Sequence, residues 1–255
     1  MRWVRTVTFY AMLLVSTILL GIAAITIVLV TRRSDWAHLC GRLWGNLNLW
    51  AAGVTVDVMG RENLDPHKPV VYAANHQSWF DIFAILGKLP VQFRWLAKEE
   101  LFRIPIMGHA MRLIGYVPID RSDRKKAFQS LEEASQRVRE GTSVVIFPEG
   151  TRSRDGVIQP FKKGGIILAI KSGQPIVPVS LSGSYKILPK GGRLVRPGRI
   201  RMTIGTPIET ASMTIEDRDR VIHLVREAIR RHLTEREGGF LSDGAPIAQG
   251  RPAVL

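Results

Sequence analysis

The stretch VVYAANHQSWFD, residues 70–81, indicates both the fold class of the chain and the place of its site. Its first part, 70–74, is a short apolar run of the kind that forms a buried strand. A polar segment follows, and the apolar residues after it predict a helix over 80–89. His76 and Asp81 therefore follow the carboxyl end of a strand, which is where open α/β sheets bind their ligands.

Strand-like and helix-like segments alternate on both sides of this stretch, which is typical of α/β proteins. The chain has 255 residues, of which 45% are hydrophobic, enough for one sizeable core. We therefore expect a single α/β domain with a largely buried mixed sheet flanked by helices. Further strands are predicted at 54–59, 92–97, 116–119, 143–147, 176–181 and 200–204, and further helices at 107–114, 122–140, 164–171 and 214–237.

A membrane-associated segment is predicted before the domain. Residues 6–30 contain no charged side chain, and as a helix they would be roughly 38 Å long, enough to cross a hydrocarbon core. The run is too long for the apolar region of a signal peptide, and no convincing cleavage site follows it. The tryptophan-rich segment 34–52 predicts a second helix, either at the bilayer surface or packed on the domain. The predicted organisation is a membrane segment over 1–52, a domain over 53–237 and a disordered tail over 238–255.

Charge and motif content restrict the class of function. The net charge of +14 favours a polyanionic partner: nucleic acid, an anionic membrane surface or a phosphorylated substrate. Cys40 is the single cysteine, so no disulfide can form within the chain, and no Cys/His cluster suggests zinc. The sequence motifs of common serine hydrolases, P-loop NTPases, zincins and dinucleotide enzymes are absent. No basic and aromatic pattern of a nucleic-acid module is present.

Three polar clusters, each after a strand-like run, are the candidate sites. The first pairs His76 with Asp81, and a carboxylate that orients a histidine makes it an effective base near neutral pH. The others contain Arg121 and the Glu149–Arg152 stretch, and two arginines could clamp a phosphate. Each cluster has a simpler structural interpretation: an ordinary loop histidine, a surface arginine, and an ion pair between Glu149 and Arg152.

Two signatures resemble those of the glycerolipid acyltransferases, the 1-acylglycerol-3-phosphate acyltransferase family. The first is His76-x4-Asp81, within the sequence NHQS at 75–78, and the second is FPEGTRS at 147–153, which matches in full. Weaker resemblances lie in GYVPIDR and IVPV, at 115–121 and 176–179. The resemblance covers about residues 53 to 210.

The resemblance implies a reaction: a fatty acyl group moves from acyl-CoA or acyl carrier protein to the sn-2 hydroxyl of lysophosphatidic acid, giving phosphatidic acid. His76 would act as the general base and Asp81 would orient it. Arg121 and Arg152 would bind the acceptor phosphate, and Glu149 would contact the acceptor or position Arg152. The expected substrate-binding residues are Arg121, Glu149, Gly150, Thr151 and Arg152.

The expected partners follow from this scheme. They are the lipid bilayer, lysophosphatidic acid and the thioester donor; no nucleic acid, metal or other cofactor is expected. The resemblance also implies that the N-terminal helices can embed in one leaflet as a hairpin, and the length of 6–30 permits this or a full crossing. Because the donor is cytosolic, we expect the domain on the cytoplasmic side of the cell inner membrane.

Three alternatives remain open at the level of sequence. The acceptor could be another lysolipid, such as a lyso-ornithine lipid, because the signatures specify the transfer better than the head group. His76 could instead activate water, which would make the protein a thioester hydrolase. A non-catalytic, membrane-anchored protein that binds anionic ligands would explain the charge but not the polar clusters.

Overall fold

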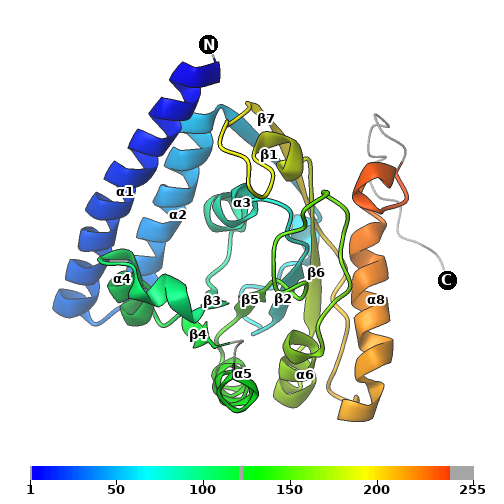
Figure 1. The fold of residues 1–255 in the computed structure, drawn as a ribbon. Helices are drawn as coiled ribbons and strands as arrows, with labels where there is room; N and C mark the ends of the chain where they lie inside the picture. The colour runs from blue at the N-terminus through cyan, green and yellow to red at the C-terminus, as the bar shows by residue number, and fades with distance from the viewer. Residues whose placement is uncertain (1, 121–122, 242–255) are drawn as a thin grey trace.

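A seven-stranded sheet forms the centre of the computed structural model, which describes residues 2–120 and 123–241 (Figure 1). The strand order across the sheet is β1-β7-β6-β2-β5-β3-β4. The strands are β1 (Val54–Met59), β2 (Val71–Ala74), β3 (Arg94–Lys98), β4 (Val117–Ile119), β5 (Val144–Ile146), β6 (Ile176–Ser182) and β7 (Gly198–Ile204).

The sheet is mixed, as the sequence predicted. Every neighbouring pair is parallel except β6 and β7, which run antiparallel with Val179 opposite Ile204. β2 is paired on both sides and fully buried, so its continuous apolar sequence matches its central position. The parallel pairing of β2 with β5 brings the carboxyl ends of these two strands together.

Helices cover both faces of the sheet and create two cores. They are α1 (Arg2–Thr31), α2 (Ser34–Ala52), α3 (Phe80–Lys88), α4 (Met107–Ile114), α5 (Arg124–Arg139), α6 (Lys163–Ser172), α7 (Ser184–Ile187) and α8 (Arg218–Arg230). Tyr72 and Ala74 of β2 pack in the core with residues of α1 to α4, whereas Val71 and Ala73 pack in the core with residues of α5, α6 and α8. This alternation follows from the two-residue period of a strand.

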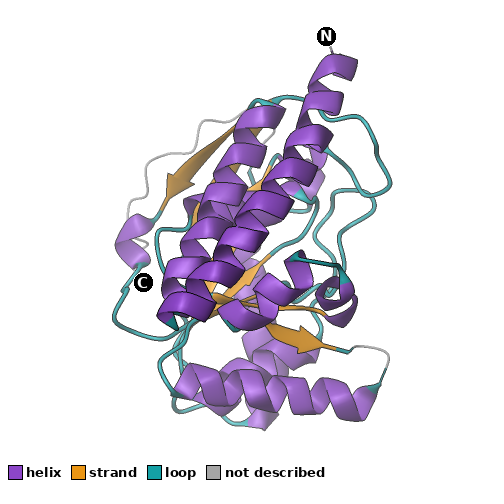
Figure 2. Ribbon diagram, turned by 90° about the vertical axis from the view of Figure 1, so that its left-hand side faces the viewer, coloured by secondary structure: helices purple, strands orange, loops and turns teal. Residues whose placement is uncertain are grey.

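The first two helices form a hairpin that packs against the domain (Figure 2). α1 is long and apolar enough to cross a membrane, with a mean hydropathy of 2.8 in its most apolar window. Phe9 of α1 is nevertheless buried against Phe80 and Phe83 of α3. α1 is therefore both the candidate membrane helix and a packed element of the fold.

α2 combines the two roles that the sequence left open. One face is docked on the domain: Ala37 and Leu49 are buried, and the Asn46 side chain donates a hydrogen bond to Gly87 O. The other face leaves tryptophan side chains exposed, with Trp36 at 51% and Trp50 at 71% of their surface. The tryptophan-rich stripe is thus available to a bilayer while the helix packs on the domain.

The C-terminal helix is shorter than predicted. The expected helix over 214–237 consists of a 3-10 turn (Ile215–Asp217), α8 and a second 3-10 turn (Glu235–Glu237). Thr234 and Glu237 form a capping box that starts the last turn, and the Glu237 carboxylate also accepts from Ser182 Oγ and Gly183 N. These bonds draw the chain back to the sheet and end the helix.

The predicted tail begins with bonded backbone. Phe240 N donates to Arg230 O and Leu241 N donates to Leu233 O, at distances of 3.2 and 3.0 Å. Residues 238–241 are therefore attached to the end of α8, although the prediction placed them in the disordered tail. The remainder of that prediction, 242–255, lies outside the described residues.

Candidate active site

His76 and Asp81 form a hydrogen-bonded pair in the loop between β2 and α3. His76 Nδ1 lies 2.9 Å from Asp81 Oδ2. The same carboxylate oxygen accepts backbone N–H bonds from Gln77 and Ser78, at 2.7 and 2.8 Å. Asp81 is fully buried in the first turn of α3, where the helix dipole favours a negative charge. The bonds fix the carboxylate, which in turn fixes the imidazole.

Aromatic stacking holds one face of the histidine ring. The His76 ring is stacked on Phe147 with centroids 3.9 Å apart and an interplanar angle of 11°. Trp95 lies next, 5.3 Å from the Phe147 centroid. Because Nδ1 is engaged with Asp81, Nε2 is the ring nitrogen available to a ligand. The pair is therefore preorganised for proton transfer at Nε2.

The predicted cluster at 149–152 lies beside the His76–Asp81 pair because β5 pairs with β2. The backbone N–H of Ser153 donates to His76 O at 2.8 Å, which joins the two loops directly. The Glu149 carboxylate accepts the backbone N–H of His76 on one oxygen and that of Gln159, at 2.9 Å, on the other. Residues separated by more than seventy positions in the sequence thus form one hydrogen-bonded unit.

Glu149 occupies a different position from the one expected. It is 3% exposed, does not line the cavity described below, and both of its oxygens bind backbone N–H groups. Burial raises the pKa of Glu149 to about 7, although the N–H donors of Gln159 and His76 oppose this rise. The geometry supports a role in holding the His76 loop, in place of the predicted contact with the acceptor or with Arg152.

Gly150, Thr151 and Arg152 lie together at the cavity. The Arg152 guanidinium lies 5.5 Å from the Trp79 ring centroid, a cation–π distance. Burial lowers the pKa of Arg152, an effect that negative Asp81 opposes, but an arginine stays charged near neutral pH. Gly150 has φ of +76°, and a β-carbon there would come within 3.0 Å of the Lys162 side chain, so glycine suits this turn.

One predicted site residue is not placed. Arg121 lies outside the described residues. The structure therefore brings together two of the predicted substrate-binding side chains, those of Thr151 and Arg152, with the His76–Asp81 pair. Ser78, which lies within the first signature, is fully buried, and its hydroxyl donates a hydrogen bond to Leu188 O at 2.8 Å. This geometry does not favour Ser78 as a nucleophile.

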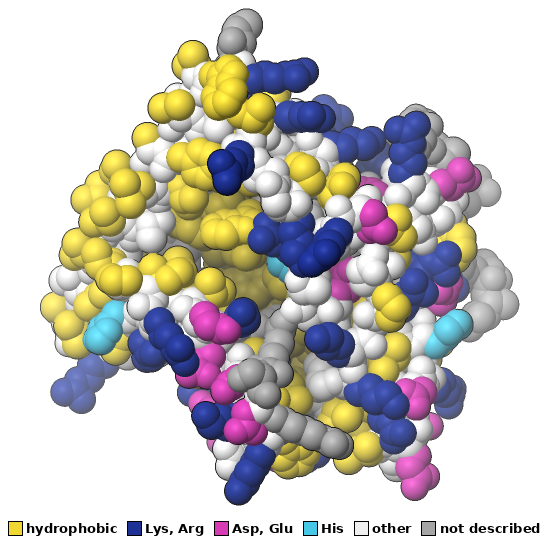
Figure 3. Space-filling model, viewed as in Figure 1, with side chains coloured by type: hydrophobic (Ala, Val, Ile, Leu, Met, Phe, Trp, Pro, Cys, Tyr) yellow, Lys and Arg dark blue, Asp and Glu magenta, His cyan; other side chains and the backbone are white. Residues whose placement is uncertain are grey.

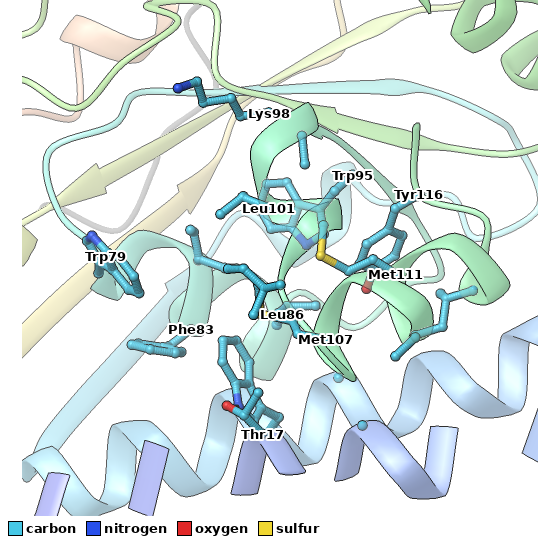
Figure 4. A pocket seen from close by; sticks show the side chains of 18 of the residues that line it. Thr17, Trp79, Phe83, Leu86, Trp95, Lys98, Leu101, Met107, Met111 and Tyr116 are labelled. Atoms are coloured by element: carbon cyan, nitrogen blue, oxygen red, sulfur yellow. The ribbon is translucent and has the colours of Figure 1, made fainter. Parts of the chain in front are cut away.

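A cavity of about 610 Å³ opens beside His76. Its walls come from α1, α2, α3 and α4 as well as from the sheet, and Figure 4 shows Phe83, Leu86 and Met107 among the apolar side chains that line it. Of the described residues that line it, only Lys98 and Arg152 are charged. Figure 3 shows the hollow with hydrophobic walls and with Lys and Arg side chains beside it. The volume is within the range of small-molecule pockets, about 300–1,000 Å³.

Sequence reasoning missed two cationic residues of this region. Lys98 lines the cavity from the end of β3. Lys190 donates from Nζ to Thr151 Oγ1 at 2.9 Å and to Arg152 O at 3.2 Å. The position of Lys98 at a strand end was a usable signal; Lys190 carried none, because its loop is far from both signatures. No group of three or more His, Cys, Asp or Glu side chains gathers as a metal site in the described part of the chain.

Comparison with known proteins identifies the relatives of this chain. Residues 55–182 match the family model described as Acyltransferase. The chain is 37% identical to a chloroplastic 1-acyl-sn-glycerol-3-phosphate acyltransferase of Brassica napus, over 80% of this chain and 61% of that protein. It is 33% identical to the 1-acyl-sn-glycerol-3-phosphate acyltransferase of Pseudomonas aeruginosa, over 79% of each chain.

A solved structure has the same fold. The crystal structure of the 1-acyl-sn-glycerophosphate (LPA) acyltransferase PlsC from Thermotoga maritima superposes with a TM-score of 0.78 at 30% identity, covering 90% of this chain and 93% of that chain. The chain spans between 49% and 61% of the length of three relatives, those from Brassica napus, Arabidopsis thaliana and Chlamydomonas reinhardtii. The family match, the identities and the shared fold agree: this chain belongs to the acyltransferase family.

Proposed function

We propose that this protein is a 1-acylglycerol-3-phosphate O-acyltransferase. It transfers a fatty acyl group from acyl-CoA or acyl carrier protein to the sn-2 hydroxyl of lysophosphatidic acid, and the product is phosphatidic acid. The observation that carries this proposal is the His76–Asp81 pair, 2.9 Å apart, beside an apolar cavity with Arg152 in its lining. The names of the relatives support the same acceptor.

In the proposed mechanism His76 acts as the general base. Nε2 takes the proton of the acceptor hydroxyl while the hydroxyl oxygen attacks the thioester carbonyl carbon, and a C–O bond forms. The tetrahedral intermediate then collapses, the C–S bond breaks, and the imidazolium returns the proton to the leaving thiolate. Asp81 stabilises the imidazolium between these two steps. General-base catalysis of this kind contributes typically about 10²–10⁴-fold in rate.

The acceptor phosphate is assigned to Arg152. Its guanidinium lines the cavity and can present paired N–H donors to phosphate oxygens. The Thr151 hydroxyl lies beside it, and Gly150 supplies the turn on which both residues sit. The resemblance adds Arg121 as a second phosphate ligand, which substitution can test. Glu149 is proposed to act indirectly, by holding the backbone of His76.

The membrane location follows from the substrates. Both acceptor and product are lipids, and the cavity is walled partly by α1, the candidate membrane helix. We propose that residues 1–52 form the membrane segment and that the domain after it lies on the cytoplasmic side of the inner membrane, where the donor is found. Cleavage of the domain by protease added outside intact spheroplasts would contradict this placement.

The test is a thiol-release assay on purified protein in detergent. Acyl-CoA and acyl-acyl carrier protein are each supplied with and without a panel of lysolipids. We expect release to depend on lysophosphatidic acid, and His76→Ala to lower it by about 10²–10⁴-fold. Release without an acceptor would indicate a hydrolase, faster release with a lyso-ornithine lipid would identify another acceptor, and no release with either donor would indicate a non-catalytic binder.

A further inference from the structure

The segment Pro189–Pro197, between α7 and β7, is hydrogen-bonded to residues that line the cavity, and we call it the rim segment. At one end it is attached to the predicted phosphate-binding loop. Lys190 Nζ donates to Thr151 Oγ1 at 2.9 Å and to Arg152 O at 3.2 Å. Thr151 and Arg152 both line the cavity, so the rim segment begins directly beside it.

At the other end the rim segment is attached to the candidate membrane helix. Val195 N donates to Thr6 Oγ1 of α1 at 3.1 Å, and the Tyr10 hydroxyl donates to Arg193 O at 3.2 Å. Tyr10 also lines the cavity. The rim segment is therefore hydrogen-bonded both to α1 and to the predicted phosphate-binding loop.

The rim segment carries only positive charge. It lies within residues 156–208, a stretch that contains nine Lys and Arg side chains and no Asp or Glu. Within the rim segment, the side chains of Arg193 and Arg196 are exposed, and neither forms an ion pair with any residue that the structure describes. Leu194, an apolar side chain between them, is 38% exposed. An exposed leucine flanked by unpaired cations suits a surface that is anionic outside and apolar beneath.

The start of α1 places the rim segment at the level of a bilayer surface. Trp3, Val4 and Val7 are exposed by 71, 71 and 65%, next to the turn that binds Val195 through Thr6. Tryptophan concentrates at the membrane–water interface, and exposed valines beside it require an apolar environment. A lipid layer that covers this part of α1 brings its headgroups to the rim segment.

We propose that the rim segment binds the anionic headgroups of bilayer phospholipids, with Arg193 and Arg196 as the contacting cations and Leu194 inserted between headgroups. The contact would hold the cavity mouth against the membrane surface. It does not depend on the reaction assigned above. An acidic protein surface would also attract the two arginines, but it would leave Leu194 and the adjacent valines of α1 uncovered.

The experiment compares partition of the full-length protein between vesicles of phosphatidylcholine and vesicles of phosphatidylcholine with one third phosphatidylglycerol, by flotation. The ratio of the two partition coefficients isolates the anionic contribution, because insertion of α1 is common to both. Each cation near an anionic surface strengthens binding by about fivefold, so Arg193→Gln with Arg196→Gln should reduce the ratio by about 30-fold. The matched control, Arg220→Gln with Arg231→Gln, removes the same charge from exposed positions at α8 and should change it by less than about twofold.

Each other outcome contradicts the proposal. An equal fall in both variants would mean that net charge, and not the rim segment, determines binding. An unchanged ratio in the rim variant would show that the rim segment does not bind anionic headgroups. If that variant also lost thiol release from acyl-acyl carrier protein, the two arginines would be assigned to binding of the donor. Unchanged partition into phosphatidylcholine verifies that the variant still folds and inserts, and high salt should abolish the wild-type preference.

Discussion

Replacing Asp81 with asparagine tests the central pair most directly. The substitution keeps the shape of the side chain and an oxygen that can accept the N–H bonds of Gln77 and Ser78, but it removes the negative charge beside His76. Asp81 Oδ1 is buried with no hydrogen-bond partner among the described residues, so the new amide group displaces no existing bond. In the proposed mechanism, the principal loss is the interaction between the carboxylate and the imidazolium that forms at His76.

The distance gives the size of this loss. Two unit charges 2.9 Å apart interact with about 6 kcal/mol at an effective dielectric constant of about 20, and with about 1.4 kcal/mol at that of water. In the proposed mechanism the imidazolium exists only during the reaction, so this free energy appears in the activation barrier. The expected decrease in kcat therefore lies between about 10-fold and 10⁴-fold. Asp81 is fully buried, which favours the larger value.

The assay is steady-state thiol release at saturating lysophosphatidic acid, with KM measured in parallel. Asp155→Asn is the matched control, because it neutralises a carboxylate in the neighbouring loop that binds Ser153, Val157 and Gln159 but not His76. We expect kcat to fall in Asp81→Asn with little change in KM, and both values to stay within about threefold in the control.

A particular result would refute the reasoning. If Asp81→Asn kept kcat within about threefold of wild type while its thermal unfolding was unchanged, charge stabilisation of the imidazolium would contribute nothing measurable. His76 would then not become charged during the rate-limiting step. A loss of kcat accompanied by an equal loss in Asp155→Asn would instead indicate a general disturbance of the two loops.

Three further predictions concern neighbouring side chains. Because burial raises the pKa of Glu149 from 4.5 to about 7, its proton stabilises the folded state at acid pH. Between about pH 4 and pH 8 the wild type should therefore lose about 3 kcal/mol of unfolding free energy relative to Glu149→Gln; the same pH dependence of unfolding free energy in both proteins would contradict this. Arg152→Gln should raise KM for lysophosphatidic acid by about 10- to 100-fold and leave KM for uncharged monoacylglycerol nearly unchanged; an equal rise for both acceptors would exclude phosphate binding. Ser78→Ala should lower stability by about 1–3 kcal/mol through the lost bond to Leu188 but keep kcat within about fivefold, and mass spectrometry of the wild type should detect no acyl-enzyme at Ser78.

Sequence patterns predicted the elements of the fold well because the signal is local. The apolar runs at 70–74 and 143–147 correspond to β2 and β5, and their adjacency in the sheet brings the two signatures together. The direction of β7 was not predictable, because an alternating strand has the same pattern whether it pairs in parallel or antiparallel. The end of α8 depends on bonds from Glu237 to Ser182 and Gly183, which its own helical pattern does not encode.

The site was predictable in its residue types but not in every role. The spacing of His76 and Asp81 suffices for their hydrogen bond, since both lie on one short loop and the turn that follows it. Glu149 could not be assigned, because its environment is created by backbone groups of His76 and Gln159 that meet only after β2 and β5 pair. Lys190 reaches Thr151 from a loop nearly forty positions away, and no local pattern marks it.

The pairing of β1 with β7 has a consequence for folding during synthesis. β1 follows the N-terminal hairpin directly, yet its only partner in the described sheet, β7, is translated about 140 residues later, with Val54 opposite Gly198. At about 5–20 residues per second, the ribosome needs roughly 7 to 30 s to supply that partner. During this interval β1, which follows the hairpin, has no strand to pair with. Early entry of α1 into the bilayer would shield its apolar surface from aggregation while the nascent chain waits for its last strand.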